Sequence, residues 1–463
     1  MIKKIIANSA LRVSGFIFPI ILLPILSRTI GASGIGLTSL FENTVRYGLI
    51  IVSFSFPITT ILKINRAKSN EEKSEIISQH ISIAGLLSIL VFLSFFVILF
   101  CFTAYFNNYA MICGFLFISQ AFSFDYIFTA LGDFKYLALR TVLIRSFSII
   151  AVYFLIKDKN DILLYLVIMT ITGVVTMVLN LRYLNRYFDL KLNLKYLIIQ
   201  EQRNYYFIIL LTSIYNSLDL LLLSFFSGEV EVGFYSSGLR LAKVPMALIG
   251  AITTVLFTEF SKSLSLNDLK EKLSSTIPLI LSFSLVCSFV LFFNSEFLVM
   301  SFLGPHFSPV IILVKVSSLL LPILTLTQVF SSQFLPILQK EDLLLKILFY
   351  GALVYIVTSI LLMNYFEAIG GVLSLLITEL FILSCSLFFF KKLSGVSIIS
   401  FFERELIGLF IILFMTEYLF YQVKLSDNPI KLFLKLALES IMIYYFLPSS
   451  KGLFKYLLKS RHV

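Results

Sequence analysis

Residues 80–104 read HISIAGLLSILVFLSFFVILFCFTA, a run that contains no aspartate, glutamate, lysine or arginine. A helix crosses about 30 Å of hydrocarbon with roughly 20 residues, because each residue adds about 1.5 Å. Lipid offers the backbone no hydrogen-bonding partner, so a run of this kind must form a helix. We therefore predict that this stretch is a transmembrane helix.

The whole chain has the same character. Of its 463 residues, 59% are hydrophobic and 14% are charged, whereas soluble domains carry about 25% charged residues. The net charge of +11 does not indicate a nucleic-acid-binding protein, because the basic residues lie in short loops between apolar runs. We expect membrane lipids around the chain and no nucleic acid.

Further runs of this length predict an all-α polytopic membrane protein with about 14 transmembrane helices; the last two runs are short, so 12 is the alternative. The predicted spans lie near residues 5–27, 36–61, 80–104, 109–131, 137–156, 161–181, 204–226, 232–259, 274–294, 309–335, 343–363, 369–390, 405–422 and 432–447.

Lysine and arginine predict the orientation. They are concentrated in the loops 62–79 and 182–203 and in the C-terminal tail, and cytoplasmic loops are the ones enriched in these residues. We therefore expect both termini in the cytoplasm and the protein in the inner (plasma) membrane.

An internal repeat suggests the domain organisation. A shift of 197 positions aligns Leu26-Ser27 with Leu223-Ser224, Gly31 with Gly228, Gly36 with Gly233 and Ser39 with Ser236. Parallel repeats of this kind build transporters whose substrate path lies between two halves. We predict an N-terminal six-helix lobe (1–181), a cytoplasmic linker (182–203), a second six-helix lobe (204–390), and two additional helices with a basic tail (391–463).

The same shift aligns two intramembrane cations, Arg46 and Lys243. Arg240 stands one turn before Lys243, and Arg12 lies within the first span. Charges inside spans usually face a water-filled cavity or a partner, so these four residues predict a cationic cavity that binds an anionic group. The alternatives are that Glu42 neutralises Arg46 one turn away, and that the other three reach the membrane surface with their long side chains.

Asp219 is a lone carboxylate midway along the seventh span. It is a candidate, with Glu42, for ion coupling or for pairing with a cavity cation; a protonated structural aspartate is the alternative. Asp125, Lys315, Glu379 and Glu417 are weaker candidates, and Arg140 and Arg145 are interpreted as anchors at the cytoplasmic end of the fifth span.

Motifs of enzymes are missing. The sequence contains no GxxxxGK[ST], HExxH or GxSxG motif, and its three histidines are scattered. We predict a protein that is not an enzyme, without catalytic residues, metal or cofactor.

Two stretches carry a family resemblance. PILSRTIG at 24–31, followed by Gly36, is similar to the opening of Wzx-type polysaccharide repeat-unit flippases, and Asp219 through GFYSS at 233–237 to Lys243 resembles a second stretch of that family. These flippases belong to the exporter superfamily that also holds multidrug and toxic-compound extrusion (MATE) transporters and the lipid II flippase.

The resemblance implies two pseudo-symmetric bundles around a cationic cavity. It implies translocation of undecaprenyl-pyrophosphate-linked oligosaccharides across the inner membrane for O-antigen or capsule assembly, with the polysaccharide polymerase and chain-length regulator as partners. It also implies that Arg12, Arg46, Arg240 and Lys243 attract the pyrophosphate or acidic sugars. The competing interpretations are a cation-coupled drug exporter of the same fold and an integral membrane polysaccharide polymerase.

Overall fold

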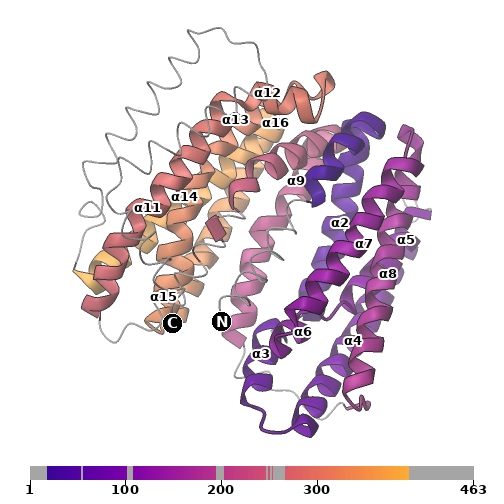
Figure 1. Cartoon of the computed structure of the whole chain (residues 1–463). Coiled ribbons are helices and arrows are strands. Elements are labelled where there is room, and N and C mark those ends of the chain that lie inside the picture. Colours follow the sequence, from indigo (N-terminus) through magenta and orange to yellow (C-terminus); the bar gives the residue numbers. More distant parts are fainter. Residues whose placement is uncertain are drawn as a thin grey trace. The chain divides into compact units, whose positions relative to one another are not determined.

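The computed structural model describes residues 18–53, 56–101, 108–193, 203–246, 249–250, 253 and 266–395. All regular elements in these ranges are helical (Figure 1). They are a first helix Phe18–Thr29, α2 (Gly31–Ser53), α3 (Phe56–Arg66), α4 (Asn70–Cys101), α5 (Asn108–Ala121), α6 (Asp125–Leu131), α7 (Phe134–Leu155), η2 (Lys159–Asp161), α8 (Ile162–Tyr187), α9 (Arg203–Ala242), α11 (Leu266–Phe293), α12 (Ser295–Phe302), η3 (Pro305–Phe307), α13 (Val310–Ser318), α14 (Leu320–Thr327), the π-helix η4 (Gln328–Phe334), α15 (Leu335–Ile337) and α16 (Glu341–Ser394).

Seven of the described helical segments are long and apolar enough to cross a membrane. One of them, α16, contains two predicted spans, because the backbone turns at Glu367, where φ is +50°. The ninth predicted span corresponds to α11, and the tenth to the continuous segment from α13 to α15. Residues 396–463, with the last two predicted spans, lie outside the described residues, so the total of 14 and the position of the C-terminus stay predictions.

Local sequence signals explain where several helices begin and end. Ser69 accepts a hydrogen bond from the Glu72 N–H at 3.1 Å and so caps α4, whose first turn carries Glu71 and Glu72. The long α16 begins with Glu341 and Asp342 and ends with Lys391 and Lys392 before Gly395, which has a left-handed backbone. Acidic residues at the start and basic residues at the end oppose the helix dipole.

The outward-facing side chains resemble those of a lipid-exposed protein. Along α7, Leu139, Leu143, Phe147 and Ile150 are each more than half exposed and follow one another every three or four residues. A soluble protein rarely leaves such a continuous apolar stripe in water. We interpret this stripe as the surface of α7 that contacts lipid, which agrees with the prediction of a multi-pass membrane protein.

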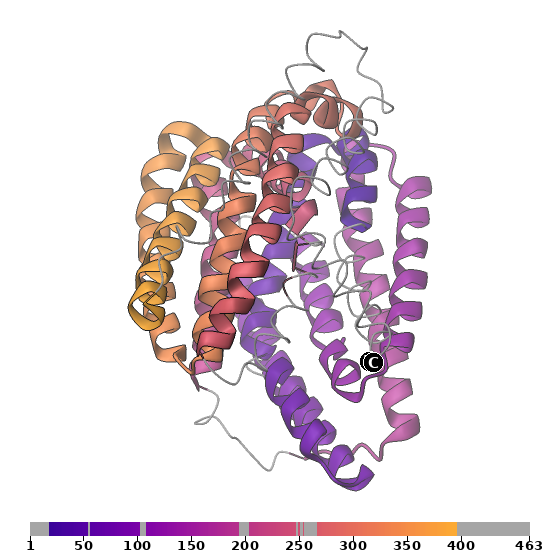
Figure 2. The same cartoon turned by 60° about the vertical axis from the view of Figure 1, so that its left-hand side comes forward.

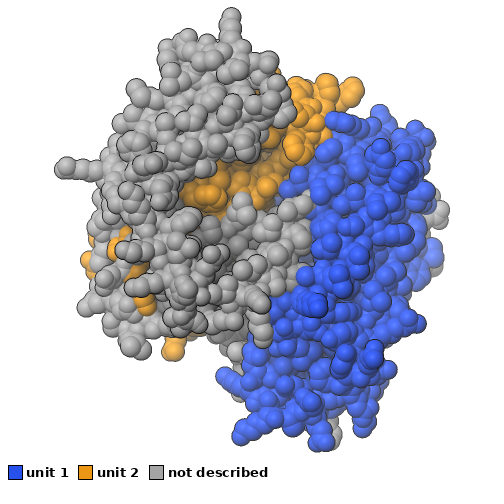
Figure 3. Space-filling model, viewed as in Figure 1, with its two compact units in different colours: residues 1, 3–236 blue, residues 2, 237–463 orange. Residues whose placement is uncertain are grey.

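The chain divides into two compact units, residues 3–236 and 237–463 (Figure 3). In unit 1, α5 packs against α2, α4 and α8, α3 packs against α6, and α7 packs against α8 (Figure 1). Its core includes Phe124, Ile127 and Phe128 from the α5–α6 region, all at most 1% exposed.

In unit 2, α14 packs against α11 and α16 (Figure 2). The rings of Phe330 and Phe334 on the π-helix both contact Phe390 of α16, with centroids 4.8 Å apart in each pair.

The division into units differs from the predicted lobes, whose boundary lies at the linker 182–203. The boundary between the units falls after Ser236, so most of α9 belongs to unit 1 together with α2, which it contacts through the Ser39–Ser236 hydrogen bond. The first residues of the predicted linker are helical, because α8 continues to Tyr187. The segment after α8 lies along α4, where the Asn193 N–H donates to Ser82 Oγ at 3.0 Å.

The packing of α9 against α2 follows the 197-residue shift. Gly31 and Gly228 both have left-handed backbones, with φ of +68° and +78°. Ser27 Oγ donates to the Pro24 carbonyl at 3.2 Å, and Ser224 Oγ donates to the Leu221 carbonyl at 2.8 Å, an equivalent pair. The shift is therefore confirmed for this part of the two helix pairs.

The repeated helices also touch at equivalent residues. Ser39 Oγ donates to Ser236 Oγ at 3.1 Å. A Cβ on Gly36 would lie 1.8 Å from the Glu229 carbonyl oxygen, and a Cβ on Gly233 would lie 1.9 Å from the Ala32 carbonyl oxygen. Since 32 and 229 are themselves related by the shift, each helix approaches the other in the same way.

Substitution of either glycine is expected to separate these helices. Gly36→Ala and Gly233→Ala each put a methyl group onto a carbonyl oxygen and should destabilise the protein by about 1–3 kcal/mol, as overpacking does. Thermal unfolding in detergent should show a lower Tm for both. Gly85→Ala is the matched control, because the nearest atom to its added Cβ is 3.4 Å away on a flexible phenylalanine ring. Equal Tm values for all three variants would contradict the close packing.

Candidate functional site

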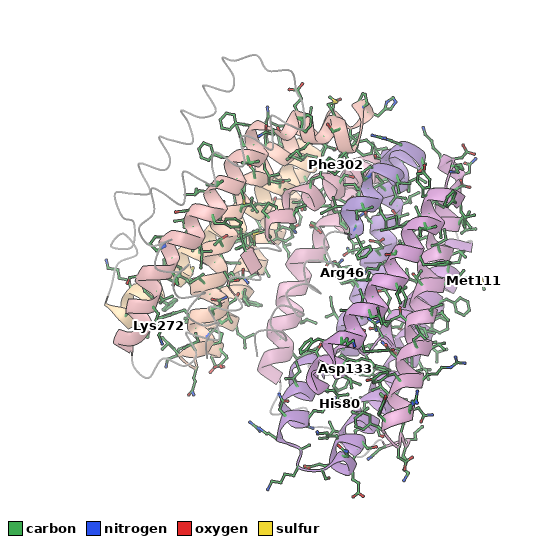
Figure 4. All side chains as sticks on the ribbon, in the orientation of Figure 1. Arg46, His80, Met111, Asp133, Lys272 and Phe302 are labelled. Atoms are coloured by element: carbon green, nitrogen blue, oxygen red, sulfur yellow. The ribbon has the colours of Figure 1, made fainter. Side chains whose placement is uncertain are left out.

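Arg46 lies on α2 in unit 1 and is exposed (Figure 4). The buried residues of α2 include Thr38, Ser39 and Asn43, and the Asn43 side chain donates to the Ser217 carbonyl at 2.6 Å. This bond ties α2 to α9. Arg46 follows Asn43 by three residues, so it lies on the same side of α2, where its side chain is exposed. Arg46 is thus an exposed cation within α2, and its place in a cationic cavity stays a prediction.

Glu42 lies one turn before Arg46 and is half-buried. Its carboxylate accepts a hydrogen bond from the hydroxyl of Tyr165 on α8 at 3.3 Å. Tyr165 is 2% exposed, so the contact draws Glu42 toward the interior of unit 1. The predicted role of Glu42 in ion coupling or cavity pairing stays a prediction.

Asp219 is buried in unit 1, with 4% of its surface exposed. Its Oδ2 accepts a hydrogen bond from the hydroxyl of the fully buried Tyr235 at 2.8 Å, and its Oδ1 accepts one from the Leu220 N–H at 2.8 Å. Both partners belong to α9, on either side of the turn at Gly228. Asp219 therefore joins the two halves of α9, and its carboxylate lies inside the unit rather than on an open surface.

Arg240 and Lys243 lie in unit 2 and are both half-buried. Arg240 is in the last turn of α9, and the Lys243 N–H still donates to the Leu239 carbonyl at 2.9 Å. Lys243 interacts electrostatically with Glu379 of α16, which is 3% exposed. Glu379 was only a weaker candidate in the sequence analysis, because a single acidic residue in an apolar run does not reveal which cation faces it.

The structure describes three of the four predicted cations. Arg12 lies outside the described residues, Arg46 belongs to unit 1, and Arg240 and Lys243 belong to unit 2. The cavity that they are expected to share stays a prediction.

Sequence reasoning missed a polar network around Arg140 of α7. The guanidinium binds the Asp125 carboxylate with two hydrogen bonds of 2.9 and 3.2 Å and the Asn180 side-chain oxygen with one of 2.8 Å. The same Asn180 oxygen accepts a bond from the Tyr136 hydroxyl at 3.0 Å. The interpretation of Arg140 as a membrane-surface anchor was wrong, because its side chain is only 5% exposed and is paired inside unit 1.

Breaks in the helices position this network. The backbone turns at Phe124, where φ is +47°, between the end of α5 and the start of α6 at Asp125. Asp133, labelled in Figure 4, precedes α7. It caps α7 by accepting the Tyr136 N–H at 3.3 Å, and its carboxylate also accepts a hydrogen bond from the Tyr183 hydroxyl. Spacing along the sequence does not indicate that Asp125 and Arg140, from two different helices, meet.

Comparisons with known proteins agree with this architecture. A family model described as polysaccharide biosynthesis protein matches residues 1–264. A Shigella dysenteriae protein named "Putative O-antigen transporter" is 26% identical over 395 residues, which is 82% of this chain and 98% of that protein. An Escherichia coli (strain K12) protein of the same name is 22% identical over 406 residues, covering 84% and 96%.

Solved structures show the fold. The lipid II flippase MurJ in an inward closed conformation has a TM-score of 0.72 at 16% identity, covering 99% of this chain and 100% of its own. An inward-facing MATE family multidrug resistance transporter of the MOP superfamily has a TM-score of 0.62 at 15% identity, covering 82% and 95%. The predicted MATE-like fold is confirmed at this level.

The family model covers more than half of the 463 residues, including the stretches 24–31 and 233–237 that carry the resemblance. The chain therefore belongs to the family of polysaccharide biosynthesis proteins.

Proposed function

We propose that this protein is a flippase that moves undecaprenyl-pyrophosphate-linked oligosaccharide repeat units across the inner membrane for O-antigen or capsular polysaccharide assembly. The observation that carries the proposal is the combination of a polysaccharide-biosynthesis family with a transporter fold. Two relatives that match nearly their whole length are named O-antigen transporters, and the MurJ structure with the same fold is that of a lipid II flippase.

The intramembrane cations support an anionic substrate. A pyrophosphate carries several acceptor oxygens, which arginine and lysine bind through charge-assisted hydrogen bonds. Arg46, the one basic residue of α2, is exposed, and Arg240 and Lys243 are half-buried. With Arg12, they are proposed to line a cavity between the lobes 1–181 and 204–390, connected by the linker 182–203.

The proposed mechanism is alternating access. The head group enters a cavity open to the cytoplasm, binds the cations and crosses as the lobes rock, while the lipid tail stays in the bilayer. No bond of the substrate is broken, so no catalytic residue is needed. Asp219 and Glu42 are proposed to couple transport to an ion, and the polymerase and chain-length regulator to receive the product.

Loss of the gene tests this function directly. Lipid-linked repeat units should accumulate on the cytoplasmic face of the inner membrane, and surface polysaccharide should disappear until a wild-type copy is supplied. Unpolymerised units outside would instead indicate a polymerase. A normal surface with increased sensitivity to cationic dyes would favour the cation-coupled drug exporter, which the likeness to MATE structures makes the second candidate.

Charge reversal is expected to abolish transport. Arg46→Glu and Lys243→Glu should each reduce surface polysaccharide at least tenfold, because they repel the anionic head group that the native residues attract. Membrane-inserted protein, measured by immunoblot, should stay at the native level. Arg186→Glu, at an exposed position near the end of α8, is the matched control and should transport normally. Native transport by both charge-reversed variants contradicts the cationic cavity.

Removal of the Asp219 charge is expected to uncouple transport from an ion gradient. In proteoliposomes, Asp219→Asn keeps an acceptor for the Tyr235 hydroxyl but cannot bind and release a proton or bind Na⁺ as a carboxylate does. Its transport should no longer respond to an imposed proton or Na⁺ gradient, whereas Tyr235→Phe should still respond. A native response of Asp219→Asn would make the residue a structural link between the halves of α9.

A further inference from the structure

Arg145 lies deeper than the sequence interpretation placed it. It is eleven residues after Phe134, the first residue of α7, which puts it about 17 Å along the helix, near its middle. An anchor at the membrane surface would lie within a turn or two of the helix end. Because an arginine in the middle of a transmembrane helix is costly, it usually faces water or a functional partner.

The environment of Arg145 differs from the lipid-facing side of α7. The exposed apolar stripe consists of Leu139, Leu143, Phe147 and Ile150, and Arg145 does not belong to it. Its guanidinium instead lies over the ring of Phe18 in the first helix, 5.4 Å from the ring centre. A cation over an aromatic face is attracted by the negative electrostatic potential of that face, so Phe18 holds this guanidinium on the protein side of α7.

Two neighbouring charged residues belong to the same region. Arg145 interacts electrostatically with both Asp125 and Arg140. Asp125 pairs with Arg140, yet 54% of the Asp125 side chain is exposed although it begins a helix within a predicted span. A carboxylate exposed to hydrocarbon would be very costly, so we take its exposed side to face water.

One N–H group of the Arg140 guanidinium is not used in the network that the structure describes. Its Nε is buried and has no hydrogen-bond partner among the residues that the structure describes, whereas its two terminal nitrogens bind Asp125, Asn180 and Thr141. An unsatisfied guanidinium N–H inside a protein costs free energy unless a water or an anionic oxygen accepts it. Arg140, Arg145 and Asp125 together carry one net positive charge, while the Asp133 carboxylate of the same network accepts hydrogen bonds from the Tyr136 N–H and the Tyr183 hydroxyl.

We propose that Arg145 and Arg140 form an anion-binding site in unit 1 that takes a phosphate or carboxylate group of the transported molecule, with Asp125 as its resident counter-ion. Arg145 contacts the anion, and Arg140 supports it from the interior. Asp125 weakens the binding by repelling the anion, which allows the anion to be released once it has crossed the membrane. The inference rests on the proposed function for the identity of the ligand, but not for the existence of the site.

Binding to the purified full-length protein in detergent tests the site. The probes are farnesyl pyrophosphate, inorganic pyrophosphate and glucuronate, with farnesol as the uncharged control, and affinity is measured by calorimetry. Arg145→Gln should weaken pyrophosphate binding at least tenfold, and Arg145→Lys should restore part of it. Arg182→Gln, at an exposed position on α8, is the matched control and should bind as the native protein does. Preference for pyrophosphate or for glucuronate identifies which anionic group the site takes.

The counter-ion makes an opposite prediction. Asp125→Asn keeps a side-chain oxygen for Arg140 but removes the repulsion, so pyrophosphate should bind roughly three- to tenfold more tightly. A purely structural network would lower the Tm of Asp125→Asn without tightening binding. Native affinity in Arg145→Gln, with a native Tm, overturns the proposal. If Arg145-dependent binding is seen but no lipid-linked oligosaccharide is moved, the site stands and the proposed function fails.

Discussion

Hydrocarbon offers no hydrogen-bonding partner to a peptide group, and this constraint organises the described structure. Each long apolar segment is helical because a helix satisfies its own backbone groups. Hydroxyl side chains follow the same rule. Ser282 donates to the Pro278 carbonyl at 2.7 Å, and Ser386 donates to the Ile382 carbonyl at 2.8 Å. Each hydroxyl thus forms its hydrogen bond within its own helix. Polar residues therefore occur within the spans without requiring contact with water.

Charged side chains need stronger compensation, and the chain provides it in different ways. Arg140 is buried and forms two hydrogen bonds with Asp125, whereas Asp219 is buried beside the Tyr235 hydroxyl. Arg46 differs from both, because its side chain is exposed and it lies within α2 rather than at a helix end. Such a residue is expensive in lipid, and this cost is the physical reason for the proposal that Arg46 faces a hydrated substrate path.

The contact between α2 and α9 shows how a repeated sequence shapes the fold. Gly36 and Gly233 each remove the side chain that would collide with a carbonyl oxygen of the other helix. In membranes, where the hydrophobic effect does not drive helices together, small residues allow the close approach on which packing depends. Gly31 and Gly228, each five residues before the contacting glycine, both have a positive φ.

The sequence by itself determined the helical membrane class, most span positions, the local 197-residue repeat and the family, because apolar length, glycine positions and short motifs are linear properties of a chain. Only the tertiary structure decided which charges meet. Asp125 and Arg140 lie 15 residues apart on different helices, and Arg145 meets Phe18 of the first helix. Such pairings depend on how helices rotate and pack against one another, and side-chain periodicity indicates a buried face without specifying the residue opposite it.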